Sequence, residues 1–190
     1  MNTNAHVLTI TLPDWLQQRL AMPVHLHDDE SRMRLVIDLA RENITRGTGG
    51  PFAAAVFRAG DGLLVAAGVN SVTRLNNAML HAEVVALMFA QARVGSYSLR
   101  GAGAPYELVT SCEPCAMCLG ATLWSGVQRL VCGATRDDAE RIGFDEGPVF
   151  AESYAYLERR GIAVVRQVLR TEAADVLDWY LRSGGIVYNG

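Results

Sequence analysis

The sequence of 190 residues contains only four histidines and four cysteines. With so few histidines, no Ser-His-Asp arrangement of the kind used by serine hydrolases can be argued. A broad cationic face is also missing, because 17 Lys and Arg stand against 20 Asp and Glu, for a formal charge of −3. Such a face drives binding to the phosphate backbone of nucleic acids. A nucleic acid partner is therefore disfavoured.

Long apolar runs, repeats and linker-like stretches are missing as well. Residues 1–15 have no basic region and no long apolar segment, so they predict neither a signal peptide nor a membrane anchor, and we expect a cytoplasmic protein. Half of the residues are hydrophobic, and the length suffices for one substantial core but not for two. We expect a single domain, 1–190, made of an N-terminal extension, a central core, and C-terminal helices, strand and tail: residues 1–30, 31–150 and 151–190.

The spacing of apolar residues predicts alternating helices and strands. A helix that begins near Asp28, Asp29 or Ser31 should end at Gly47, and RGTGGPF then forms a turn that lacks the GK[ST] ending of a phosphate loop. The runs PFAAAVF and LLVAAGV flank Asp-Gly, which is a strong hairpin signal. Further strands are expected at YELVTS, RLVCGAT, IAVVRQVL and, at an edge, VLTITL; further helices are expected at PDWLQQRLA, LHAEVVALMFAQARVG, PCAMCLGATLWSG, VFAESYAYLERRG and TEAADVLDWYLRSGG. The five strands other than VLTITL, together with the helices, predict an α/β fold, a three-layer α/β/α sandwich with a mixed five-stranded sheet.

Three of the four cysteines fall in SCEPCAMC, residues 111–118. Proline is favoured at the first helical position, so Pro114 is expected to open a helix with Glu113 near its N-cap. Cys115 and Cys118 are then three residues apart on one helical face, within reach of a common ion. Cytosolic thiols stay reduced, and both a cation and a helix N-terminus lower a thiol pKa. These two cysteines are therefore predicted to bind a metal ion as thiolates.

Two thiolates need a further ligand, and His81 is the histidine that opens a helix after a strand. If His81 and the two cysteines are the only protein ligands, a tetrahedral zinc ion keeps its fourth position for water, whose pKa it lowers to about 7. Glu83, two residues after His81, would accept the proton of that water. We expect Cys112 and Cys132 to lie in the core; the alternative is a closed structural site that recruits one of them. Iron could occupy the same thiolate-rich site.

The two motifs, HAE at 81–83 and PCAMC at 114–118, together match the H-x-E and P-C-x-x-C pattern of zinc-dependent deaminases. With these residues the chain resembles the cytidine deaminase-like superfamily, and within it the bacterial guanine deaminases. The resemblance runs from about residue 33 to residue 150, through GGPFAAAVF, GVNSV, TSCEPCAMCLGATLW and GFDEG. The zinc motifs identify the superfamily, whereas GVNSV and GFDEG carry the finer likeness.

This resemblance implies roles for residues outside the metal motifs. The family positions that contact the purine and assist proton movement match Asn70 and Glu146, and Glu146 departs from the family, which has Asp there. The positions that match the base pocket are Phe52, Ala82 and Trp124. In guanine deaminases an aromatic C-terminal tail covers the active site of a dimer partner, so the resemblance implies a homodimer, with Tyr188 in an exchanged tail. The segment TRLNNAMLHAE replaces the family's DPTAHAE, so we expect one pocket wall to differ.

The activity implied by the resemblance is hydrolytic deamination of a free purine base, guanine to xanthine plus ammonia, with one zinc ion and one catalytic water per chain. A tRNA adenosine deaminase shares the zinc motifs, but the C-terminal run TEAADVLDWYLRSGG is acidic where that group is basic. A cytosine or cytidine deaminase is a further alternative. A non-catalytic, zinc-stabilised binding module is the alternative from another class, and Glu83 argues against it because a structural site needs no acid beside an open position.

Overall fold

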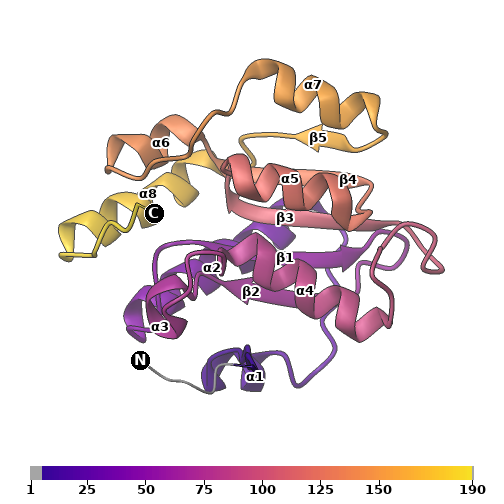
Figure 1. The fold of residues 1–190 in the computed structure, drawn as a ribbon, viewed down its shortest axis with the longest axis horizontal. Coiled ribbons are helices and arrows are strands. Elements are labelled where there is room, and N and C mark those ends of the chain that lie inside the picture. The colour runs from indigo at the N-terminus through magenta and orange to yellow at the C-terminus, as the bar shows by residue number, and fades with distance from the viewer. Residues whose placement is uncertain (1–5, 190) are drawn as a thin grey trace.

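The structure, a computed structural model, describes residues 6–189, which contain a five-stranded sheet with the order β2-β1-β3-β4-β5 (Figure 1). β1 pairs antiparallel with β2 and β3, whereas β3, β4 and β5 run parallel, so the sheet is mixed as predicted. The strands are Ala53–Arg58 (β1), Leu64–Val69 (β2), Tyr106–Cys112 (β3), Arg129–Ala134 (β4) and Ala163–Val165 (β5). The helices are Asp14–Arg19 (α1), Asp29–Thr45 (α2), Val72–Leu75 (α3), Ala82–Val94 (α4), Ala116–Ser125 (α5), Arg136–Arg141 (α6), Ala151–Arg159 (α7) and Arg170–Arg182 (α8). None of the helices within 6–189 is both long and apolar enough to cross a bilayer.

Two apolar clusters, one on each face of the sheet, separate three layers. Successive strand residues point to opposite faces, so Ala55 and Phe57 pack with α2 and α8, whereas Ala54 and Val56 pack with α4, α5 and α7. All four of these β1 side chains are fully buried. Figure 1 shows α4 and α5 side by side across the second face. The three-layer α/β/α sandwich predicted from the sequence is confirmed.

Local sequence signals explain where several elements begin and end. The side chain of Asp28 accepts a hydrogen bond from the main-chain N–H of Ser31 at 2.7 Å, and this cap starts α2. The helix ends just before Gly47, which has the left-handed φ of +65° that glycine adopts without strain. Gly62, with φ +67°, closes the turn between β1 and β2. The predicted capping region, helix end and hairpin are therefore confirmed.

The beginning of α5 differs from the prediction. The N-cap is Cys115, so Pro114 precedes the helix instead of opening it, and Glu113 is not the cap. The main-chain N–H of Glu113 donates to the Ala134 carbonyl at 2.9 Å, which prolongs the ladder between β3 and β4 past the end of the strands. A residue before proline also avoids the helical region. The chain therefore stays extended through Cys115.

Two further differences concern short elements. Residues 7–12 form no strand although they alternate in polarity, and the prediction of an edge strand there is wrong. Instead, His25 forms an isolated antiparallel β-bridge with Leu63, the residue just before β2. The helices α3 and α6 were not predicted, because four and six residues are too few to show helical periodicity.

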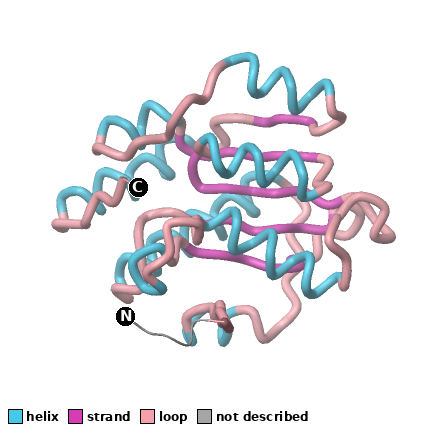
Figure 2. Tube along the Cα trace, viewed as in Figure 1, coloured by secondary structure: helices cyan, strands magenta, loops and turns pink. Residues whose placement is uncertain are grey.

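Three chain segments meet at one edge of the sheet. The N-terminal ends of α4 and α5 lie on the same side of the molecule as the C-terminal end of the described chain (Figure 2). The connection from β3 to α5 and the loop after α6 also reach this edge. The fold therefore gathers the motifs at 81–83 and 114–118 with the GFDEG segment and the tail.

Candidate active site

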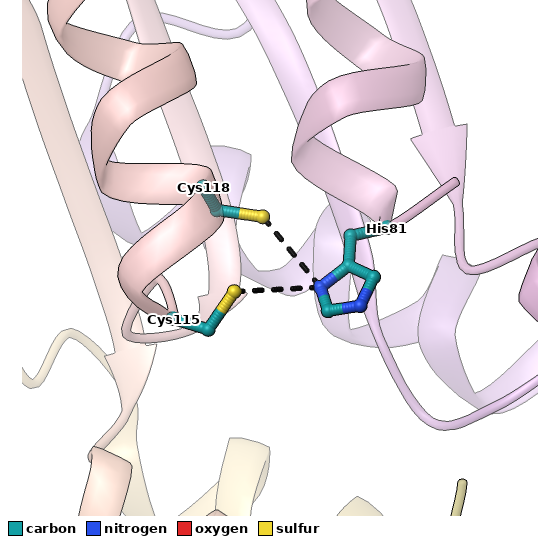
Figure 3. Close-up of side chains that lie close together, drawn as sticks. All are labelled: His81, Cys115 and Cys118. Carbon is teal, nitrogen blue, oxygen red and sulfur yellow. Dashed lines mark hydrogen bonds between the residues drawn. The ribbon is translucent and has the colours of Figure 1, made fainter. Parts of the chain in front are cut away.

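Three side chains that can bind a metal ion meet where α4 and α5 begin (Figure 3). His81 is the N-cap of α4, Cys115 is the N-cap of α5, and Cys118 lies in the first turn of α5. The Nδ1 atom of His81 is 3.5 Å from Sγ of Cys115 and 3.7 Å from Sγ of Cys118. One ligand atom from each residue lies within 4.8 Å of the others.

These separations fit a tetrahedral zinc ion. With Zn–S near 2.3 Å and Zn–N near 2.05 Å, a sulfur and a nitrogen ligand lie about 3.6 Å apart. In the described part of the chain no other group of His, Cys, Asp and Glu meets the same distance limit. Cys112 directs its sulfur to the Thr135 carbonyl at 3.4 Å, and Cys132 is fully buried in the core. If His81, Cys115 and Cys118 bind an ion, neither of the other cysteines is placed to fill its fourth position, which argues against the closed structural site.

The two thiols do not ionise independently. Contact with Cys118, and then with His81, lowers the pKa of the Cys115 thiol to about 4. The Cys115 sulfur and burial raise the pKa of Cys118 well above its usual value. A divalent ion bound between the two sulfurs would favour the thiolate form of both. The donor set of two sulfurs and one imidazole suits zinc.

Two buried carboxyl groups stand beside the metal ligands. Glu83 lies in the first turn of α4 with 6% of its surface exposed, and Glu146 lies in the loop after α6 with 8% exposed. Burial, and then the negative charge of Cys115, raise the pKa of both carboxyl groups, that of Glu146 to about 8. Acids with a raised pKa are suited to hold and release a proton near neutral pH. The site therefore offers two candidates for acid–base chemistry.

A cavity of about 620 Å³ is lined by His81, Cys115 and both acids. The Phe144 ring packs edge-on against Phe52 at 5.0 Å and against Tyr188 at 5.1 Å, and the three rings contribute to its wall. Asn70, 1% exposed, lines the same cavity. The Tyr188 hydroxyl is buried and has no hydrogen-bond partner among residues 6–189. Aromatic surfaces with polar groups at their rim suit a planar heterocycle.

Two residues expected at the pocket have side chains elsewhere. Ala82 is fully buried in the cluster between α4 and the sheet. Trp124 is 77% exposed, and it lies about two and a half turns along α5 from Cys115. Within one chain neither side chain lines the cavity, contrary to the expectation. The residues that do line it as expected are Phe52, Asn70, His81, Glu83, Cys115, Glu146 and Tyr188.

Several residues of this wall were not expected from the sequence. Phe144 belongs to the GFDEG motif, two positions before Glu146, and its place in that motif was the available signal. Thr73, Asn76 and Asn77 line the cavity from α3 and the turn after it. This segment departs from the family pattern, and so short a helix leaves no periodic signal.

Comparison with known proteins identifies the family. The profile of the cytidine and deoxycytidylate deaminase zinc-binding region matches residues 26–134, more than half of the chain. The chain belongs to this deaminase family. A guanine deaminase from Bacillus subtilis (strain 168) is 35% identical to this deaminase over 150 residues, which are 79% of the chain and 92% of the relative.

Solved structures agree with this assignment. The guanine deaminase from Nitrosomonas europaea matches with 47% identity and a TM-score of 0.89, covering 93% of this deaminase and 97% of that chain. The structure of NE0047 in complex with 2,6-diaminopurine matches with 47% identity and a TM-score of 0.91, covering 96% and 97%. The predicted cytidine deaminase-like fold and the likeness to guanine deaminases are therefore confirmed.

Proposed function

We propose that this deaminase is a guanine deaminase, a single-domain enzyme that hydrolyses guanine to xanthine and ammonia with one zinc ion per chain. The observation that carries the proposal is a three-ligand metal group that opens into an aromatic cavity with two buried acids. The likeness to guanine deaminases at 35% and 47% identity supports guanine as the base. The net charge of −3 argues against tRNA as the substrate.

Glu83 is the proton carrier of the proposed reaction. A zinc ion held by His81 and the two cysteines would lower the pKa of water to about 7 and so supply a nucleophile near neutral pH. As the water oxygen bonds to C2 of guanine, Glu83 takes up a proton and delivers it to N3. It then passes the second water proton to the amino group, and the C2–N bond breaks to release ammonia. Burial of Glu83 at the cavity keeps this transfer away from bulk water.

The remaining cavity residues orient the base. Asn70 and Glu146 present polar groups to the purine edge, while Phe52 and Phe144 contact its faces. The side chain of Ala82 is buried in the core, so a contact with the base from this position uses its main chain.

The tail closes the cavity of its own chain. Asn189 accepts a hydrogen bond from the Asp145 main chain and donates one to the Gly143 carbonyl, both at 2.9 Å. These bonds hold Tyr188 at the cavity wall, where it excludes water. The same contacts serve the proposed homodimer, in which the tail closes either its own cavity or, after exchange, that of the partner.

A homodimer accounts for two exposed apolar side chains. Trp124 on α5 is 77% exposed and Met88 on the neighbouring α4 is 41% exposed. A second copy that covers the outer surface of these helices would bury both.

The four described cysteines are free, which supports a reducing compartment such as the cytoplasm.

An ammonia-release assay of the zinc-loaded protein tests the function. Guanine should be turned over faster than adenine, cytosine, cytidine, adenosine or tRNA, and Glu83→Gln should lower kcat by about 10²–10⁴-fold. Glu172→Gln, an exposed position on α8, is the matched control and should keep the wild-type rate. Faster turnover of another amine, or no turnover with zinc bound, overturns the proposal; full activity of Glu83→Gln removes the role of Glu83.

A further inference from the structure

A buried amide joins three segments behind the cavity. Asn43, in the last turn of α2, is fully buried. Its Nδ2 donates hydrogen bonds to the carbonyls of Gly50 at 2.9 Å and of Asn70 at 3.0 Å. Its Oδ1 accepts one from the Thr48 hydroxyl at 2.6 Å. The side chain thus connects α2, the glycine turn and the end of β2, with both of its N–H groups and its carbonyl in use.

Hydrogen bonds hold both main-chain polar groups of Asn70, the N–H and the carbonyl. Its N–H donates to the Phe52 carbonyl at 2.9 Å, and its carbonyl accepts from Asn43. The Asn70 Oδ1 atom also accepts from the Val72 N–H at 3.3 Å. With these bonds in place, the direction in which Asn70 enters the cavity depends on where Asn43 holds its carbonyl.

The turn at Gly49 and Gly50 packs closely against both the Asn70 main chain and the tail. A Cβ atom on Gly49 would lie 1.9 Å from the Asn70 carbonyl oxygen, and one on Gly50 would lie 1.9 Å from the Tyr188 hydroxyl. Packing this close transmits a displacement directly, because interiors deform little. A small shift of the turn therefore moves both the Asn70 main chain and Tyr188.

The amide is itself held from the N-terminal side. Thr48 uses its one hydroxyl proton on Asn43, and the hydroxyl oxygen accepts a hydrogen bond from Nε1 of Trp15 at 3.0 Å. Trp15 belongs to α1, so this chain of bonds runs from the N-terminal segment to the cavity. Linked hydrogen bonds of this kind strengthen one another and favour a single geometry.

We propose that Asn43 is a positioning residue for the deaminase site, which sets the purine contact of Asn70 and is held in place by Thr48 and Trp15. This inference rests on the proposed function. A core residue of pure packing value would be apolar, because an amide at this depth contributes little unless every bond is made. The fully hydrogen-bonded network fixes the position of the Asn70 main chain, and Asn70 lines the cavity.

Thr48 offers a gentler test than Asn43, whose replacement risks the fold. Thr48→Val keeps the shape but removes the hydroxyl, and it should raise KM for guanine about tenfold with kcat changed less than about threefold. Thr48→Ser restores the hydroxyl and should return KM to within about twofold of wild type. Thr45→Val removes an exposed hydroxyl bonded to the Arg41 carbonyl on the same helix and is the matched control, with no effect expected. Trp15→Phe should raise KM by about two- to threefold, since it removes one bond further from the cavity.

A double-mutant cycle separates positioning from general destabilisation. In the background of Asn70→Ala, Thr48→Val should have no further effect on kcat/KM, because the side chain that it misplaces is gone. Additive effects of the two changes, or equal effects of Val and Ser at position 48, overturn the proposal. Zinc content and the thermal midpoint of each variant show that the comparison is made on folded, loaded protein.

Binding of 8-azaguanine to the zinc-loaded protein, measured by calorimetry, keeps the two proposals distinguishable. If the wild type releases ammonia from guanine but Thr48→Val leaves KM and the 8-azaguanine Kd unchanged, the positioning role fails while the function stands. If the wild type binds 8-azaguanine without deaminating guanine, the function fails, and the Kd ratio of Val to Ser still decides the role of Asn43. Absence of any purine binding overturns both.

Discussion

Replacing Asp138 by Asn should weaken the connection between two walls of the cavity. Asp138 is 3% exposed, and its Oδ2 accepts hydrogen bonds from the main-chain N–H of Thr135 at 2.9 Å and from the Thr135 hydroxyl at 2.8 Å. Arg170, the first residue of α8, donates to its two oxygens at 2.9 and 3.1 Å. This one carboxylate therefore ties α6, which leads into the loop of Glu146, to α8, which leads into the tail of Tyr188.

The magnitude follows from the ionisation of this carboxyl group. The hydrogen bond from Arg170, and then those from Thr135, lower the pKa of Asp138 from 3.8 to about 2. Such a shift corresponds to about 2.5 kcal/mol, which is an upper limit; because Arg170 is nearly half exposed, solvent screening can lower the value to about 1.5 kcal/mol. The folded-state pKa lies below the unfolded value, so the contribution is complete above about pH 5, falls to about half near pH 3 and is nearly gone at about pH 2.

Urea denaturation, followed by tryptophan fluorescence, measures this loss when wild type and variant are compared in the same metal-bound state at each pH. Asp138→Asn should be less stable than wild type by about 1.5 to 2.5 kcal/mol at about pH 7, and the difference should shrink at about pH 3. Asp178→Asn is the control, because its bond to Arg141 at 2.9 Å lies at the surface and should contribute less than about 0.5 kcal/mol. A loss at neutral pH no larger than that of the control, or one that is the same at both pH values, refutes the reasoning.

Three further changes test the metal group, the dimer and the core. Cys118→Ser should lower the zinc content at fixed free zinc at least about tenfold by metal analysis, whereas Cys132→Ser in the core should keep it; equal zinc in both would contradict the ligand assignment. Trp124→Glu places a charge on the outer surface of α5 and should shift a dimer to monomer in sedimentation velocity, so an unchanged distribution excludes this face. Arg32→Met leaves the buried Glu107 with a single arginine and should cost about 3 kcal/mol in urea denaturation; a loss below about 1 kcal/mol would show that the remaining arginine suffices.

The meeting of His81, Cys115 and Cys118 could be predicted from the sequence because each of the three follows a local rule. His81 and Cys115 each stand at the start of a helix that follows a strand, and Cys118 shares the first turn with Cys115. Such positions depend on a few neighbouring residues, which a short motif records. The continuous apolar runs of the strands likewise predicted the sandwich, because a sheet that is covered on both faces buries every residue of β2 and β3.

The contacts that complete the site depend on residues far apart in the chain. Asn43 reaches Asn70 across 27 positions, and Trp15 reaches Thr48 across 33. Such contacts cannot be predicted from a short stretch of sequence, because the partners come together only when the whole chain is folded. Trp124 is the opposite case, in which a local pattern gave the wrong position. Its place in a family motif predicted a residue of the pocket wall, but its side chain is exposed on the outer surface of α5.

The shifted start of α5 connects the metal ligands to the acid loop. An N-cap side chain ordinarily accepts a hydrogen bond from the first turn of its helix, but neither His81 nor Cys115 makes such a bond. The two side chains instead approach each other at 3.5 Å, which leaves main-chain N–H groups of α5 in need of another acceptor. The Ala116 N–H finds it in the Glu146 carbonyl at 3.0 Å. The segment that caps the ligand helix is therefore the one that carries the second acid, so the positions of Cys115 and Glu146 in the cavity are set by one hydrogen bond between residues 30 positions apart in the chain.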